Sequence, residues 1–136
     1  MPLPYHPARG EVLICDFDTG FKPPEMVKKR PVVVVSTKES HGRKLCTVVP
    51  ISTTESMKPS PWHHTLSHLT VPGWKATGPM WAKCDMIATV SFDRLNKPYM
   101  STRSGRSYST VMLVGEDMLC INACLLSYLA LLAAPK

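Results

Sequence analysis

The stretch Lys28–Ser36, KKRPVVVVS, decides the fold of this 136-residue chain. Its four consecutive valines, Val32 to Val35, are typical of a strand that is buried on both faces or lies at the centre of a small barrel. Pro31 stands in front of them, where a missing backbone N–H is tolerated. The basic segment EMVKKR, residues 25–30, precedes the strand. The chain therefore enters its core directly from a charged loop.

Short runs rich in Val, Ile and Thr, bounded by Gly, Pro, Ser and Lys, lie on both sides of this strand. Such runs predict strands, here at residues 11–17, 31–36, 45–52, 65–71, 80–87, 89–92 and 109–113. Pro50, near the end of one of them, indicates an edge or a bulge. Three Pro-, Gly-, Ser- and Lys-rich segments are expected to be functional or mobile loops, namely residues 19–29, 53–64 and 96–106.

The pattern changes after Val114. Residues 116–133 are good helix formers, with Glu116 and Asp117 in the first turn and Pro135 just past the end. The predicted helix is apolar almost all the way round, so we expect one face to pack on the barrel and another to be covered by a subunit or partner. Its apolar run is shorter than the roughly 20 residues that a membrane span needs.

Composition narrows the class of protein. The chain is 44% hydrophobic and 19% charged, which excludes intrinsic disorder and predicts one domain over residues 1–136. A net charge of +6 favours a polyanionic partner such as nucleic acid. The five cysteines have no zinc-site spacing, so we expect reduced thiols and no metal. The first residues lack a secretory signal, and we therefore expect a cytoplasmic protein.

Three places carry polar residues that a small barrel could present to a ligand. Arg30, at the foot of the valine strand, is a rigidly placed donor fork suited to a phosphate. Ser52 and Thr53 end another strand, where hydroxyls orient a phosphate or cap a turn. Lys83 and Asp85 are two residues apart on a predicted strand. Side chains two apart point to the same face, so these two should lie about 7 Å from each other. Each site also has a purely structural interpretation. Arg30 could lie in a solvated loop, Ser52 and Thr53 could cap a turn, and Lys83 and Asp85 could form a surface ion pair.

A fourth place combines histidines with aromatic residues. His63, His64 and His68 follow Trp62, and they could stack bases or titrate near neutrality. Their spacing matches no metal motif, and a solvated loop would look the same. Arg103 and Arg106 lie on a Ser- and Gly-rich segment and are expected to steer a phosphate backbone toward the protein.

Four segments, in this order, resemble the MazF/PemK (Kid) family of toxins from type II toxin–antitoxin systems. They are RGEVLICDFD (9–18), KKRPVVVVS (28–36), TVVPISTT (47–54) and AKCDMIATVSFDRL (82–95). The resemblance implies an SH3-like small β-barrel of the CcdB/MazF/PemK type with a C-terminal helix. It also implies a homodimer that cleaves single-stranded RNA at short sequences without a cofactor, and a cognate antitoxin that neutralises it.

The resemblance assigns catalytic roles by position. Arg30 matches the family's arginine before the valine strand and becomes the main electrostatic stabiliser. Asp85 corresponds to the aspartate that Kid-type members use as a base, and Glu25 to a loop glutamate that is the alternative base. Metal-free RNA cleavage needs such a base for the 2′-hydroxyl, a cation for the charge on phosphorus and an acid for the leaving oxygen.

Other positions match less closely. Ser52 falls where many members have a catalytic Thr, and Thr53 could serve instead. Lys83 replaces an arginine, Pro24 stands where the Kid-type histidine would be, and Met86 replaces a polar residue. The acid is therefore Lys83 or Arg30. The expected RNA contacts are Thr53, Lys28, Lys29, His63, His64, Arg103 and Arg106.

Two other functions remain open at this point. A non-enzymatic toxin like CcdB shares this barrel but binds DNA gyrase through its C-terminal helix, and the apolar C-terminus fits that interpretation. The departures at Pro24, Lys83 and Met86 would also permit a catalytically inactive RNA-binding barrel, which would show salt-dependent RNA binding without cleavage.

Overall fold

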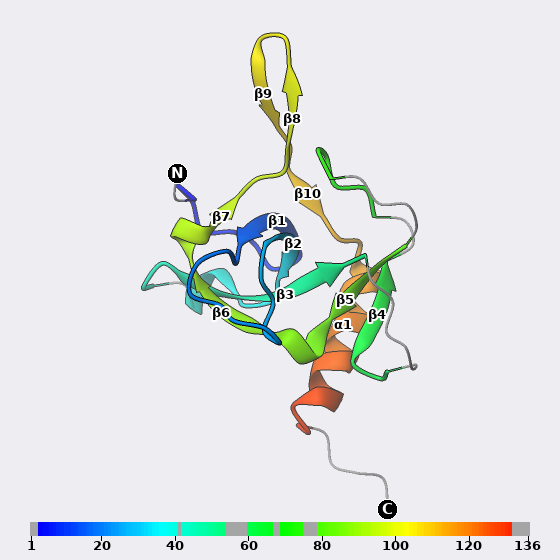
Figure 1. Cartoon of the computed structure of the whole chain (residues 1–136). Coiled ribbons are helices and arrows are strands. Elements are labelled where there is room, and N and C mark those ends of the chain that lie inside the picture. Colours follow the sequence, from blue (N-terminus) through cyan, green and yellow to red (C-terminus); the bar gives the residue numbers. More distant parts are fainter. Residues whose placement is uncertain (1–2, 41, 54–59, 67–68, 75–78, 132–136) are drawn as a thin grey trace, which may run out of the picture.

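The computed structural model describes residues 3–40, 42–53, 60–66, 69–74 and 79–131 (Figure 1). The strands in this part are β1 Glu11–Asp16, β2 Lys29–Val34, β3 Leu45–Ser52, β4 His63–Leu66, β5 Met80–Lys83, β6 Ala88–Ser91, β7 Leu95–Asn96, β8 Tyr99–Thr102, β9 Gly105–Tyr108 and β10 Val111–Met112. Short 3-10 helices are η1 Lys38–Ser40, η2 Cys84–Met86 and η3 Phe92–Arg94, and the α-helix is α1 Gly115–Tyr128.

The main sheet is antiparallel and contains eight strands. Its order is β10-β1-β2-β3-β5-β4, with β6 also pairing with β3 and β7 with β1. The sheet curls into a half-barrel, and α1 lies beside β4 and the 3-10 helix η2 (Figure 1). The expected fold class, a small barrel-like β structure with a C-terminal helix, is confirmed.

The valine strand lies between two apolar clusters. Val32 and Val34 pack into one cluster with Leu13 of β1, whereas Val33 packs into the other with Ile121 of α1. All five of these side chains are fully buried. Because successive residues of a strand face opposite sides, β2 contributes to both clusters, as its sequence predicts.

The predicted strand at residues 80–87 is wrong in its second half. β5 ends at Lys83, and η2 follows before β6 begins. Ala82 pairs with Ile51 of β3, whereas Ala88 pairs with Val48, so six steps along one strand correspond to three along the other. The extra residues are taken up by η2. Pro50 lies in β3 between the segment that pairs with β5 and the segment that pairs with β6. The sequence indicated an edge or a bulge here, because proline lacks a backbone N–H.

The predicted strand at residues 65–71 is also misplaced. β4 begins at His63, inside the segment expected to be a loop, and ends at Leu66. Beyond β4, Leu69 N–H donates to the Leu66 carbonyl, and Trp74 N–H donates to the Val71 carbonyl across a turn at residues 72–73. Residues 54–59 and His68, which belonged to the expected loop and histidine cluster, lie outside the described residues.

The segment 96–106 is not the loop that its polar composition predicted. β8 and β9 form a separate two-stranded hairpin that projects from the half-barrel (Figure 1). Thr102 pairs with Gly105, so only two residues form the turn. Gly105 has a φ of +120°, a conformation that favours glycine. The Tyr, Ser and Thr residues of β8 and β9 were the sequence feature that could have predicted these two strands.

The C-terminal helix is shorter than predicted. α1 begins at Gly115, with Glu116 and Asp117 in its first turn as expected, and ends at Tyr128 rather than at residue 133. Ala130 follows with a φ of +54°, which is incompatible with continued helix. In the part of the chain that the structure describes, no helix is both long and apolar enough to cross a membrane.

Candidate active site

Arg30 and Ser52 lie on the same face of the sheet. Val32 of β2 pairs with Pro50 of β3. Continuing this antiparallel pairing by two residues sets Arg30 opposite Ser52, and directly opposite residues in such a pair point to the same side. The pairing of β2 with β3 therefore brings the Arg30 guanidinium and the Ser52 hydroxyl to the same face, although the two residues are far apart in the sequence.

Neighbouring strands extend this face. Ser52 pairs with Trp81 of β5, and Lys83, two residues further along, pairs with His63 of β4. Residues two apart on a strand share a face, so Trp81, Lys83 and His63 lie on the side that carries Ser52. We call the predicted catalytic residues Arg30, Ser52, Lys83 and the Asp85 described next, together with Trp81 and His63 beside them, the catalytic face.

Asp85 reaches this face through His63. Its Oδ1 lies 2.8 Å from His63 Nε2, which joins η2 to β4. The prediction that Lys83 and Asp85 share one strand is wrong, because β5 ends at Lys83 and Asp85 lies in η2. The same turn of chain lets Asp85 meet His63, a contact that spacing along the strand did not predict. The side chain of His63 is 11% exposed and that of Asp85 32%.

The geometry determines the direction of the bond between His63 and Asp85. An ionised carboxylate only accepts, so His63 Nε2 carries the donated hydrogen. His63 Nδ1 is buried and has no hydrogen-bond partner among the described residues. His63 thus donates to Asp85 and leaves the second carboxylate oxygen for another partner.

Arg30 also carries an unused donor. Its Nε is buried and has no hydrogen-bond partner within the described part of the chain. Ser52 is 4% exposed, whereas Thr53 is exposed at the end of β3. A buried guanidinium donor without a partner is costly unless a ligand accepts from it. The Nε of Arg30 is therefore available to donate to a ligand.

The loop before β2 is organised differently. Glu25 is exposed, and its Oε1 accepts a hydrogen bond from the Lys22 backbone N–H at 2.7 Å. Lys28 and Lys29 are both exposed, and Lys28 has a φ of +82°. The structure thus assigns Glu25 a role in closing a turn and shows no contact between it and the catalytic face.

The remaining basic candidates lie elsewhere. His64 points to the opposite side of β4 from His63, and its Nε2 lies 2.9 Å from Asp117 Oδ1 in the first turn of α1. Arg103 is exposed at the turn of the hairpin. The Arg106 guanidinium lies over the Tyr99 ring, 4.4 Å from its centroid. A side-chain hydrogen bond with Tyr108 raises the pKa of Arg106 above its usual value.

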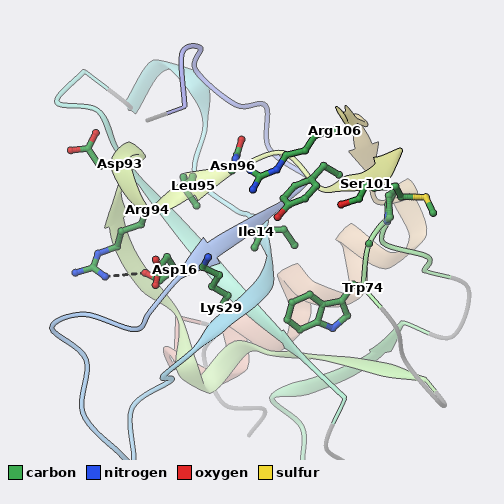
Figure 2. A pocket seen from close by; sticks show the side chains of 14 residues that line it. Ile14, Asp16, Lys29, Trp74, Asp93, Arg94, Leu95, Asn96, Ser101 and Arg106 are labelled. Atoms are coloured by element: carbon green, nitrogen blue, oxygen red, sulfur yellow. Dashed lines mark hydrogen bonds between the residues drawn. The ribbon is translucent and has the colours of Figure 1, made fainter. Parts of the chain in front are cut away.

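A cavity of about 640 Å³ opens on another side of the half-barrel (Figure 2). Ile14 and Leu95 line its apolar part, with Asp16 and Lys29 on one side and Trp74 on another. The sequence singled out Lys29 and Arg106 of this group as RNA contacts, but it did not identify the cavity. Its walls come from β1, β2, η3, β7, β8, β9 and the turn at Trp74, which are far apart in the sequence.

Metal and thiol chemistry have little support in the described residues. No group of three or more His, Cys, Asp or Glu there is arranged to hold a metal ion. All five cysteines are free, and burial raises the pKa of the Cys15 and Cys84 thiols to about 12. These two thiols are therefore packed in the core as neutral groups.

Comparison with known proteins decides the family. The family described as PemK-like, MazF-like toxin of type II toxin-antitoxin system matches residues 8–113. The chain belongs to this PemK/MazF toxin family. The match covers the catalytic face, the cavity and the hairpin, and it confirms the resemblance found in the four sequence segments.

Individual PemK/MazF relatives agree. YifN of Escherichia coli (strain K12) is 31% identical over 117 residues, covering 71% of this chain and 76% of that protein. MazF from Deinococcus radiodurans is 22% identical, with a TM-score of 0.65 over 93% of this chain and 98% of that one. An endoribonuclease solved in complex with its cognate antitoxin, from a mycobacterial species, is 21% identical, with a TM-score of 0.58 over 94% and 99%. The two structures show that the fold is shared.

Proposed function

We propose that this chain is a cytoplasmic endoribonuclease toxin that cleaves single-stranded RNA at short specific sequences without a metal, acts as a homodimer and is neutralised by a cognate antitoxin. The observation that carries the proposal is Arg30, whose buried and unpaired Nε shares a face with Ser52 and the bonded pair of His63 and Asp85. Membership of the toxin family, and structural neighbours described as an endoribonuclease with its antitoxin, support it.

The reaction can be followed through the groups on the catalytic face. Asp85 takes the proton of the 2′-hydroxyl, whose oxygen attacks the adjacent phosphorus. Arg30 donates to the phosphoryl oxygens as negative charge develops on them, and Ser52 orients the phosphate. The bond from phosphorus to the 5′-oxygen breaks, and Lys83 or Arg30 protonates that oxygen. The products are a 2′,3′-cyclic phosphate and a 5′-hydroxyl, so DNA is not cleaved.

Asp85 is a better candidate for the base than Glu25. His63 holds one carboxylate oxygen of Asp85 on the face that carries Arg30, whereas Glu25 closes a turn with Lys22. His63 is a positioning residue in this scheme, because it acts through Asp85. A fixed carboxylate reduces the reorganisation needed before proton transfer.

Cleavage of a long single-stranded RNA in excess EDTA tests the proposal. The wild-type protein should give discrete cuts with cyclic phosphate and 5′-hydroxyl ends. Arg30→Ala should lower the cleavage rate by about 100-fold or more, because one preorganised donor to a developing charge contributes that much. Asp85→Asn should lose the base while keeping the bond from His63.

Three controls sharpen this test. The same RNA with 2′-deoxy substitution at the cut site should resist cleavage. Circular dichroism and thermal unfolding should show that both variants are folded. A fully active Arg30→Ala variant would refute the assigned role, and no cleavage by folded wild-type protein would favour a gyrase-binding toxin or an RNA-binding barrel instead.

A further inference from the structure

The cavity beside Trp74 faces away from the catalytic face. Lys29 and Arg30 are consecutive in β2, so their side chains leave opposite sides of the strand. Lys29 pairs with Asp16, and both line the cavity, whereas Arg30 shares the face of Ser52. The start of β2 therefore separates two polar sites that the chain presents on different sides.

The cavity provides a surface for a flat, partly apolar ligand. Trp74 and Tyr99 line it together with Ile14, and Figure 2 shows Trp74 across the cavity from Asp16 and Lys29. A volume of about 640 Å³ lies within the usual range for small-molecule sites. Aromatic side chains in a basic setting are the groups on which nucleobases stack.

Gly73 shapes the cavity by allowing a close backbone approach. A Cβ at this position would lie 2.0 Å from the Tyr99 carbonyl oxygen, and its φ is +74°. Only glycine permits both features. The turn that carries Trp74 is thereby held directly against β8.

The charges around the cavity suit one phosphodiester. Lys29, Arg94 and Arg106 contribute three positive charges, and Asp16 and Asp93 contribute two negative ones. The excess of one positive charge matches the single negative charge of a nucleotide unit in RNA and disfavours a triphosphate.

Two of the cations are already fixed in place. Arg106 lies over the Tyr99 ring, and Arg94 lies over the Phe21 ring at 4.8 Å while it donates to the Asp16 backbone carbonyl. Asn96 Oδ1 accepts from the Lys97 N–H at 2.9 Å, which leaves its amide hydrogens for a base edge. These fixed side chains lower the entropy lost on binding.

We propose that this cavity binds one nucleotide of a single-stranded RNA, at a position outside the scissile unit. The base packs on Trp74 and Tyr99, Asn96 donates to its edge, and Lys29 and Arg106 contact its phosphate. The choice of RNA as the ligand rests on the proposed function, whereas the nucleotide chemistry of the cavity does not.

The test is calorimetric titration of the full chain carrying Arg30→Ala, which removes the main anion-binding group of the catalytic face. The probes are adenosine and uridine 5′-monophosphate, and a 2′-O-methyl tetranucleotide that cannot be cut. Adding Trp74→Leu should weaken tetranucleotide binding by about tenfold or more, the range found for loss of a stacked base. Adding Lys29→Gln, which removes a phosphate contact, should also weaken it. Trp74→Phe, which keeps an aromatic ring, should retain most of the affinity.

The matched charge controls are Lys38→Gln and Arg43→Gln. Each removes the same charge from an exposed residue that does not line the cavity. Both should cost much less affinity than Lys29→Gln. Equal losses in all four charge and stacking variants would show diffuse electrostatics and overturn the proposal.

Other outcomes also decide the matter. Tetranucleotide binding unaffected by Trp74→Leu in a folded protein overturns the proposal. Monophosphate binding without tetranucleotide binding indicates a free nucleotide effector, and loss of antitoxin binding alone indicates a protein-docking site; both overturn it. Cleavage by wild-type protein with these negative results leaves the proposed function standing, whereas specific tetranucleotide binding without any cleavage supports the cavity and contradicts the endoribonuclease.

Discussion

β4 carries two adjacent histidines, and each is hydrogen-bonded to a different aspartate. His63 donates to Asp85 on the catalytic face, and His64 bonds Asp117 in α1, with nearly equal distances of 2.8 and 2.9 Å. Adjacent residues of a strand face opposite ways, so one bond serves the site and the other fixes the helix. This arrangement provides a matched pair for mutation.

We expect His63→Ala to lower kcat by up to about 100-fold with little change in KM, because a carboxylate displaced by about 1 Å loses that much. His63→Gln keeps a donor near the Nε2 position and should recover most of kcat. Steady-state cleavage of a short RNA measures both constants.

His64→Ala is the comparison, since it breaks a similar bond on the other side of β4. It should lower the free energy of unfolding by about 1 kcal/mol, as the loss of one such hydrogen bond does, and affect kcat far less than His63→Ala. Equal kcat losses in the two alanine variants, or no recovery with Gln, would show that His63 contributes only to stability.

At the scale of the elements, the turn before Trp74 requires a glycine at position 73. Gly73→Ala should lower the free energy of unfolding by about 1–3 kcal/mol from the positive φ alone, and the contact with the Tyr99 carbonyl adds to this. Gly42→Ala is the control, because nothing lies within 4 Å of a Cβ at that position. Urea unfolding of the two variants measures the difference, and equal stability would contradict the close approach.

The strands that the sequence predicted well are those buried by β-branched residues. β2 and β3 consist of Val-rich runs bounded by charged or Gly-containing segments, so local pattern and final structure agree. The break at η2 has no such local signal, because residues 80–87 contain no Gly or internal Pro. It follows from the need of the chain to pair with β3 in two registers, which only the tertiary structure contains.

The candidate site was predictable in the same limited sense. Arg30 and Ser52 were found as polar residues at strand ends, but their position opposite each other depends on the register between β2 and β3. The bond from His63 to Asp85 joins residues 22 apart in the sequence. Short-range sequence patterns carry no information on such contacts. The cavity could not be predicted for the same reason, because its lining residues come from segments far apart in the sequence.

For the whole molecule, α1 leaves much apolar surface uncovered. Only Ile121 of this helix is buried, whereas Leu119 is 69% exposed and Leu131, just beyond the helix, 67%. Trp62, in the loop before β4, packs edge-on against Tyr128 at 5.4 Å, on the side of the helix opposite to Leu119. We propose that the side of α1 that carries Leu119 is covered by a second copy of the chain, because an exposed leucine of this kind is typical of an interface.

Leu119→Glu should therefore shift the protein toward monomer, because it places a charge in the proposed interface. Sedimentation velocity over a range of concentrations measures this shift. Leu45→Glu is the matched control, since Leu45 is 41% exposed at the distant end of β3, where it pairs with Ser91. A wild-type protein that stays monomeric at high concentration would contradict the proposed dimer.

The hairpin of β8 and β9 has a consequence for how such a toxin can diversify. Its outer residues, Met100 to Arg103 and Gly105 to Tyr108, are exposed on both faces and bury nothing in the half-barrel. Substitutions, insertions or deletions near its tip are therefore nearly free of folding constraints. Selection can alter what the hairpin touches while the core and the catalytic face stay unchanged, so closely related chains could acquire different targets.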